Sequence, residues 1–311
     1  MTRPEVSVVI PTRDRWRMLE ACGLRSALSQ TRVEVEVIVV DDGSRDETAA
    51  ELDRLRDSRV HVLRHDMSKG RAAARNAGIA AARGDWLAFL DDDDLWSPVK
   101  LRRQLDRAAE TDVLVCTGVL EIDESLNPLQ MRVPGPTTRD ALLGWNTIPA
   151  GSSTVMARAD DVRAVGGLDE RLTYVEDWDL WIRLAARGGL AVVPEVLVAY
   201  VRHGSGSRFA GRHAVDEMQY FVKKHEPSGL RADPAAFLWW VAMDNRLDGR
   251  RLAAASTYLR TALTYRRPRR ALRAFATLLE PRGRKTMRSW AARSQPPISL
   301  PDDVPWLASY R

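Results

Sequence analysis

The sequence predicts an α/β protein, with a mostly parallel, doubly wound sheet that has helices on both faces, followed by a helical C-terminal region. The first ~120 residues alternate short strand patterns with helical patterns, which is typical of βα units. The strand patterns are largely apolar, as expected where helices cover both faces of a sheet. From about residue 211 onward only helical patterns follow.

Strands are predicted from β-branched and apolar runs, and helices from apolar residues at helical spacing. In the first part of the chain, the predicted strands are 6–10, 35–40, 60–64 and 86–90, and the predicted helices are 15–30, 47–56 and 70–83. Further along, the predicted strands are 113–122, 154–157, 190–193 and 196–201, and the predicted helices are 160–165 and 176–187. The segment 127–138, with three prolines, predicts turns.

The C-terminal region predicts a small helical bundle joined by short loops. Its predicted helices are 212–225, 233–247, 250–265, 268–280 and 283–293. A Gly/Ser-rich stretch at 203–207 predicts a boundary near 205–211. We therefore expect two domains, residues 1–210 and residues 211–311.

Composition is that of an ordinary soluble globular protein, with 45% apolar and 29% charged residues. No apolar stretch reaches 18 residues, and the first residues lack a signal-peptide layout, so we expect a cytoplasmic protein. Cys22 and Cys116 do not have the spacing of a metal motif, which indicates reduced thiols.

Positive charge is concentrated in residues 250–293, which hold 13 Lys or Arg and one acid, Glu280. A block of one sign indicates a partner of the opposite sign, such as anionic lipid, nucleic acid or an acidic protein. A solvated helical face is an equally good interpretation of this block.

Four consecutive aspartates, 91–94, follow the apolar run 86–90. Crowded carboxylates repel one another and are costly to desolvate, so they indicate a bound cation. Aspartate is also common in turns and helix caps, and we expect Asp94 to cap the helix that begins near Pro98.

Polar segments 11–15, 41–44 and 65–76 also follow predicted strands, and carboxyl ends of parallel strands share one edge of a sheet. Their side chains suit a ligand that carries hydrogen-bond donors and phosphate. Asp42 would accept from a nucleobase N–H, while Lys69, Arg71 and Arg75 would neutralise phosphate oxygens. The aspartates would bind Mg²⁺ or Mn²⁺ rather than zinc, stabilising a diphosphate leaving group.

A fifth segment, 174–181, opens a predicted helix with several acids. Favourable interaction with the helix dipole explains one or two of these carboxylates without catalysis. Trp178 and Trp181, three residues apart, are typical of sugar-binding sites and equally of hydrophobic cores.

Taken together, these motifs resemble family 2 glycosyltransferases over about residues 5–205. The resemblance is carried by Val6–Thr12, Asp41–Ser44, Gly70 with Ala74–Gly78, Phe89–Asp94 and Glu176–Trp181. It implies a GT-A fold and transfer of a sugar from a nucleotide-diphosphate donor, with inversion at the anomeric carbon.

The resemblance also implies roles for residues of the donor side. Pro11 and Asp42 match nucleobase contacts, with Thr12 and Asp14 nearby. Asp92 is expected near the ribose or sugar of the donor.

Metal and catalytic roles follow from the same resemblance. Asp91 and Asp93 match the family's Asp-x-Asp motif, with Asp93 as the direct metal ligand. Asp177 matches the catalytic base, and Glu176 is the alternative. His203 resembles a third metal ligand or a diphosphate contact, although a surface role is an equally good interpretation.

The Gln-x-x-Arg-Trp motif of processive family members is absent, so we expect addition of one or a few sugars, with a UDP-sugar favoured as donor. Acceptor contacts are expected from 130–175, including Gly151, Ser152 and Ser153. We expect a lipid-linked or otherwise anionic acceptor, peripheral contact of 250–293 with an anionic inner membrane face, and no nucleic-acid partner.

Two other function classes compete with this interpretation. A sugar-phosphate nucleotidyltransferase would carry a glycine-rich loop after the first strand, and 11–15 contains no glycine. A catalytically silent module that binds a nucleotide sugar or a partner protein stays open.

Overall fold

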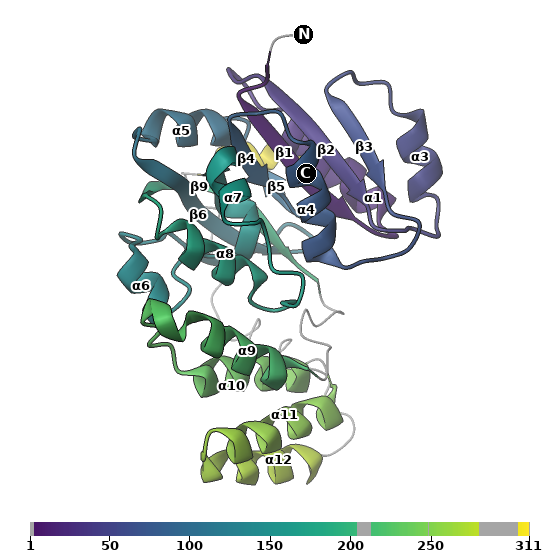
Figure 1. Cartoon of the computed structure of the whole chain (residues 1–311). Helices are drawn as coiled ribbons and strands as arrows, with labels where there is room; N and C mark the ends of the chain where they lie inside the picture. Colours follow the sequence, from purple (N-terminus) through teal and green to yellow (C-terminus); the bar gives the residue numbers. More distant parts are fainter. Residues whose placement is uncertain (1–2, 204–212, 248, 280–303, 311) are drawn as a thin grey trace. The chain divides into compact units, whose positions relative to one another are not determined.

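The computed structural model describes residues 3–203, 213–247, 249–279 and 304–310 (Figure 1). The chain divides into two compact units. The first contains residues 1–142, 146–202 and 299–311, and the second contains residues 143–145 and 203–298. The predicted boundary near 205–211 and the predicted helix 283–293 lie outside the described residues.

The described part of the first unit contains one nine-stranded mixed sheet, in the order β3-β2-β1-β4-β8-β6-β9-β5, with β7 paired to β6 (Figure 1). Its strands are β1 (Val6–Thr12), β2 (Val35–Asp41), β3 (Val60–Arg64), β4 (Trp86–Phe89), β5 (Leu95–Trp96), β6 (Asp112–Asp123), β7 (Pro128–Arg132), β8 (Val155–Arg158) and β9 (Gly189–Arg202). Strands β1 to β4 pair in parallel, as the alternating pattern predicts.

Beyond β4 the sheet becomes mixed. Strand β8 runs antiparallel to β4 and β6, whereas β6 and β9 pair in parallel. The predicted strands 190–193 and 196–201 form one strand, β9, whose pairing with β6 shifts register between Thr117 and Gly118. Strand β7 lies in the segment predicted as turns. The sequence does not indicate this strand, because its residues are mostly exposed and lack an apolar pattern.

Helices cover both faces of the parallel strands, as predicted. The helical elements of this unit are α1 (Trp16–Met18), a π-helix (Leu19–Leu24), α2 (Arg25–Leu28), α3 (Thr48–Arg54), α4 (Arg71–Ala81), α5 (Lys100–Arg107), α6 (Arg139–Gly144), a 3₁₀ turn (Gly151–Thr154), α7 (Ala159–Ala164), α8 (Glu176–Leu184) and a 3₁₀ helix (Pro305–Tyr310). Alternate residues of a strand face opposite sides of a sheet. Helix α4 packs on Val9, where a Cβ on Gly78 would lie 2.4 Å from Cγ1 of Val9. On the other face, Val8 and Ile10 pack in one core with Leu19 and Leu101.

The described part of the second unit is helical. Its elements are α9 (Ala214–His225), a 3₁₀ turn (Glu226–Ser228), α10 (Pro234–Leu247), α11 (Arg251–Thr264) and α12 (Pro268–Leu279). Ala242, Ala255, Tyr258 and Ala274 form a small buried core between the last three helices. None of the helices in the described residues combines the length and the hydropathy needed to span a bilayer.

Candidate active site

Polar residues gather where β1, β2 and β4 end. Thr12 pairs with Asp41 in the register of β1 and β2, and the Leu90 N–H donates to the Val9 carbonyl. Because these strands are parallel, the loops that follow them leave the same edge of the sheet.

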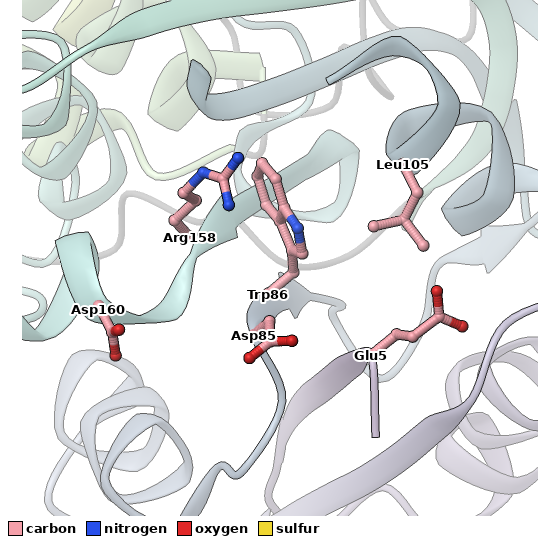
Figure 2. Close-up of a pocket in the computed structure, with 6 residues that line it drawn as sticks. All are labelled: Glu5, Asp85, Trp86, Leu105, Arg158 and Asp160. Atoms are coloured by element: carbon pink, nitrogen blue, oxygen red, sulfur yellow. The ribbon is translucent and has the colours of Figure 1, made fainter. Parts of the chain in front are cut away.

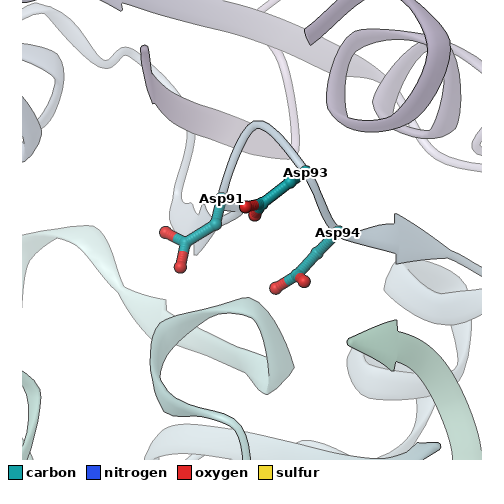
Figure 3. Close-up of side chains that lie close together, drawn as sticks. All are labelled: Asp91, Asp93 and Asp94. Atoms are coloured by element: carbon teal, nitrogen blue, oxygen red, sulfur yellow. The ribbon is translucent and has the colours of Figure 1, made fainter. Parts of the chain in front are cut away.

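Three of the four consecutive aspartates form a cluster (Figure 3). One carboxylate oxygen each of Asp91, Asp93 and Asp94 lies within 4.8 Å of the others. Oxygen ligands at this spacing suit a hard divalent cation such as Mg²⁺ or Mn²⁺. Asp93 also accepts a 2.8 Å hydrogen bond from Arg15.

Asp94 does not cap a helix, so that prediction is wrong. Helix α5 begins at Lys100, its N-cap residue is Val99, and no side chain caps it. The two-residue strand β5 separates Asp94 from this helix. Asp94 is fully buried, its Oδ1 accepts from the backbone N–H of Val201 in β9, and its carboxylate belongs to the aspartate cluster.

Asp92 makes a separate set of contacts. Its Oδ2 accepts from the Thr12 hydroxyl at 2.8 Å, and its Oδ1 accepts from Arg15 at 2.8 Å. Burial, together with the charge of Asp93, raises the pKa of Asp92 to about 7. The hydroxyl of Thr12 and the guanidinium of Arg15 only partly oppose that rise.

Backbone contacts hold the aspartate loop in place. The Gly23 N–H in the π-helix donates to the Asp92 carbonyl at 3.2 Å, and a Cβ on Gly23 would lie 3.1 Å from Cα of Asp92. On the other side, the Asp91 N–H donates to the Ser153 hydroxyl, while the Trp96 indole N–H donates to the Ser153 carbonyl. The loop is therefore fixed between the first helical segment and the 3₁₀ turn.

Asp42 is surrounded by donors from the loop after β3. Its Oδ1 accepts from His65 Nδ1 at 2.8 Å and from the Lys69 N–H at 2.9 Å. Its Oδ2 accepts from the Ser68 hydroxyl at 2.7 Å and from the Gly70 N–H at 2.9 Å. Burial opposes ionisation, but these hydrogen bonds outweigh it and hold the pKa of Asp42 below its ordinary value. Lys69 reaches Asp42 through its backbone, and its side chain is exposed.

The loops after β1 and β2 are joined by Asp14. Its N–H donates to the Ser44 hydroxyl at 2.9 Å, and its Oδ1 accepts from the Arg45 N–H at 2.6 Å. Pro11 lies inside β1, where it pairs with Val40.

Two arginines of α4 connect Glu176 to the aspartate cluster. Glu176 is buried, and its Oε1 lies 2.7 Å from the guanidinium of Arg71 and 3.4 Å from that of Arg75. Arg75, only 2% exposed, also bonds Asp91 at 2.5 Å. The charge of Glu176 raises the pKa of Arg71. Both arginines predicted as phosphate contacts are thus bound to carboxylates here.

Asp177 sits beside this network but differs from Glu176. It is partly exposed and accepts from the Trp178 N–H at 2.6 Å. Burial and the neighbouring charge of Glu176 raise the pKa of Asp177 to about 6. The Trp178 N–H and the charges of Arg75 and Arg71 act in the opposite direction. Glu176 is therefore neutralised by arginine, whereas Asp177 has the proton affinity of a general base near neutral pH.

Comparison with known proteins gives the family of the chain. Residues 7–164 match the model of "Glycosyl transferase family 2". The chain belongs to this family.

Two curated relatives illustrate the match. The chain is 34% identical to the succinoglycan biosynthesis protein ExoO of Rhizobium meliloti, over 67% of this chain and 65% of the relative. It therefore spans slightly less than two thirds of that relative's length. It is 29% identical to the Escherichia coli UDP-Glc:alpha-D-GlcNAc-diphosphoundecaprenol beta-1,3-glucosyltransferase WfaP, over 61% of this chain and 74% of the relative.

A solved structure matches the fold. The mannosyltransferase PcManGT from Pyrobaculum calidifontis, in complex with GDP-Man and Mn²⁺, superposes with a TM-score of 0.54. The match covers 99% of this chain and 80% of that protein at 19% identity. The predicted GT-A fold and the predicted family are confirmed.

The two tryptophans of α8 belong to the core of this family 2 protein. Trp178 and Trp181 are 2% and 0% exposed. The Trp178 indole N–H donates to the Leu142 carbonyl, and the Trp181 ring lies 6.2 Å from that of Phe89. Of the two interpretations of this pair, the structure supports the hydrophobic core.

His203 belongs to the second unit and is not a member of the aspartate cluster found among the described residues. Its role as a ligand stays a prediction.

A pocket at the other end of β4 has no part in this site (Figure 2). It is lined by Glu5, Asp85, Trp86, Leu105, Arg158 and Asp160. The Arg158 guanidinium lies 4.5 Å from the centre of the Trp86 ring. Trp86 begins β4 whereas the aspartates follow its end, so the pocket opens at the opposite edge of the sheet.

Sequence reasoning missed several residues that shape the site. Arg15 was within the segment after β1, but nothing in the sequence indicated that it would bind Asp92 and Asp93. Ser153, an expected acceptor contact, accepts a hydrogen bond from the Asp91 N–H, and the sequence does not indicate this contact. Gly151 lies next to the Asp177 carboxylate: a Cβ on Gly151 would be 3.3 Å from Oδ2 of Asp177.

Proposed function

We propose that the protein is an inverting, metal-dependent glycosyltransferase that moves a sugar from a UDP-sugar to an acceptor hydroxyl, without processive polymer synthesis. One observation carries the proposal. The aspartate cluster and Asp177 flank a buried network in which Arg75 bonds Asp91 and approaches Glu176. Sugar transfer with inversion is a displacement at the anomeric carbon, which needs a base on the acceptor side and charge stabilisation at the leaving group.

Asp177 takes the proton of the attacking hydroxyl. With a pKa of about 6 it is mostly ionised at neutral pH, and it is basic enough to hold a proton during the reaction. We assign the base to Asp177 rather than Glu176, because the Glu176 carboxylate is already paired with Arg71 and Arg75. In this arrangement Glu176 positions the two arginines, and Asp177 is the only carboxylate of the pair that reacts.

Asp91, Asp93 and Asp94 would hold Mg²⁺ or Mn²⁺, and the cation would neutralise charge that develops on the diphosphate leaving group. Support for the fit comes from the three converging carboxylates of this chain. The Mn²⁺ bound by PcManGT is consistent with it. Arg75 would be shared between Asp91 and the donor phosphates once the cation lowers the negative charge at Asp91.

Donor recognition is assigned to the loops after β1, β2 and β3. Asp42 would accept from the nucleobase, after exchange of one of its four internal donors. Pro11, Thr12 and Asp14 lie on the same edge, and Asp92 would face the ribose or sugar. UDP is favoured as the nucleotide because WfaP, a relative, is named for a UDP-Glc donor.

For the acceptor we propose a lipid-linked saccharide, as used in cell-surface glycan synthesis. The name of WfaP includes a diphosphoundecaprenol acceptor, and residues 250–293 are strongly basic. We assign catalysis to residues 1–210 and peripheral contact with an anionic inner membrane face, from the cytoplasmic side, to residues 211–311.

The test is release of UDP from several UDP-sugars, with and without Mn²⁺, by the intact chain and two variants. Asp177→Asn should abolish transfer while donor binding, measured by calorimetry, survives. Asp93→Asn should weaken Mn²⁺-dependent donor binding. Transfer at the wild-type rate in Asp177→Asn would refute the assignment of the base, and binding without turnover across all donors would identify a silent module.

A further inference from the structure

Three large apolar side chains of α11 are exposed on one face. Leu252, Leu259 and Leu263 are 79%, 44% and 73% exposed, and Ser256, between them, is exposed as well. Successive residues of an α-helix are about 100° apart, so positions 252, 256, 259 and 263 share one narrow face. We call these four residues the leucine face.

The opposite face of α11 already supplies the packing of the helix. Ala255 and Tyr258 are buried in the core that also includes Ala242 and Ala274. Thr261 and Ala262 are buried too. A surface helix normally turns its leucines inward and its small or polar residues outward, whereas α11 does the reverse.

Positive charge is concentrated in the stretch of sequence that contains the leucine face. Residues 249–279 contain eight arginines and no acid. From outside this stretch, Asp216 of α9 pairs with Arg260 at 2.5 Å, and Asp233, just before α10, pairs with Arg267 at 3.4 Å. Residues 249–279 are therefore strongly cationic as a stretch of sequence.

The charge selects among possible partners of the leucine face. A second copy of the chain would bring two sets of arginines together, and this repulsion opposes self-association. An anionic bilayer surface offers negative headgroups for the arginines and an acyl boundary for the leucines. Helix α11 has 14 residues and is about 21 Å long, which suits a helix lying in the interface rather than crossing it.

We propose that α11 docks on anionic membrane with its leucine face inserted at the headgroup–acyl boundary. This inference deepens the membrane contact proposed above, on which it rests. It adds that charge alone is insufficient, because apolar insertion by Leu252, Leu259 and Leu263 supplies a large share of the binding.

The test is co-sedimentation of the full chain with vesicles of phosphatidylcholine alone or with phosphatidylglycerol added. The wild type should bind the anionic vesicles much more strongly than the neutral ones. Leu252→Ser combined with Leu263→Ser should lower the partition coefficient about tenfold or more, which corresponds to a loss of about 1.4 kcal/mol. Met131→Ser, a change at a 44% exposed side chain of β7, is the matched control and should bind as the wild type.

Salt and stability measurements identify other outcomes. Residual wild-type binding at high salt, lost in the double variant, supports insertion, because salt screens only the charge contribution. Wild-type binding by the double variant would refute the role of the leucines. A lower melting temperature or a change from dimer to monomer in that variant would show that the chain itself, or a second copy, covers the face, and would also refute the proposal.

Release of UDP without vesicles is measured in parallel on the same samples. The leucine variants should retain it, so a failure of membrane docking is distinguished from a failure of the proposed transferase activity.

Discussion

Acidification tests the role of Asp177 most directly. If ionised Asp177 is the base, kcat/KM follows the ionised fraction of a carboxyl whose pKa is about 6. That fraction is about 0.9 at pH 7, about 0.5 at pH 6 and about 0.1 at pH 5. Activity should therefore be nearly full at pH 7 and fall about tenfold between pH 7 and pH 5. An aspartate with the ordinary value of 3.8 would still be about 0.9 ionised at pH 5.

The variant Glu176→Gln should shift the acid limb of this pH profile in a defined direction. It removes the negative charge that, after burial, does most to raise the pKa of Asp177. The acid limb should then move to lower pH, because the remaining arginine charges favour ionised Asp177. If Glu176 were the base, this variant would lose activity at every pH.

The assay is UDP release at limiting donor and acceptor between pH 4.5 and pH 8, with saturating Mn²⁺. Asp92, whose pKa is about 7, is the other group that could titrate here. A bound cation favours its charged form, and Asp92→Asn removes it, so an acid limb that persists in this variant belongs to Asp177. A profile that stays flat down to pH 5, or a limb that does not move in Glu176→Gln, would refute the reasoning.

Three further predictions concern the supports of the site. Glu176→Gln should lower the free energy of unfolding in urea by about 2–3 kcal/mol, because buried Arg75 loses one of its two carboxylates, whereas exposed Glu34→Gln should leave it unchanged. Gly151→Ala should cost about 1 kcal/mol in backbone strain at φ +61° and also lower kcat, since its Cβ would lie 3.3 Å from Asp177 Oδ2. Gly166→Ala is the control, with φ +83° and no atom within 4 Å, and equal losses of kcat in both variants would contradict a contact effect. Asp94→Asn should weaken Mn²⁺ binding in calorimetry while the circular dichroism of the helices is unchanged, and unaltered Mn²⁺ affinity would remove Asp94 from the metal site.

The parallel half of the sheet could be predicted because β1, β2 and β4 are buried on both faces and its strands are bounded by turn residues. Strand β7 could not, since its side chains are largely exposed and its proline and polar residues look like a turn. The predicted helix 15–30 is interrupted by the π-helix at Leu19–Leu24, where Gly23 packs on the aspartate loop, and helical periodicity carries no signal for that contact.

Residues of the site could be named because motifs at strand ends converge in a parallel sheet. Their partners could not be, since pairings such as Arg75 with Asp91 and Arg15 with Asp92 depend on side-chain directions that sequence spacing does not give. Asp94 was assigned to the wrong element for a related reason. A two-residue strand has no periodicity, so the sequence does not predict β5. The start of the next helix is therefore predicted near Pro98, whereas α5 begins at Lys100.

The four donors around Asp42 have a consequence for the rate of the catalytic cycle. In the proposed donor site, a nucleobase has to displace a donor that the loop returns as soon as the base leaves. The loop thus competes with the nucleobase for Asp42 and weakens the binding of the donor substrate and of the spent nucleotide alike. Weaker retention of the spent nucleotide shortens its residence time, and turnover is then less limited by product release.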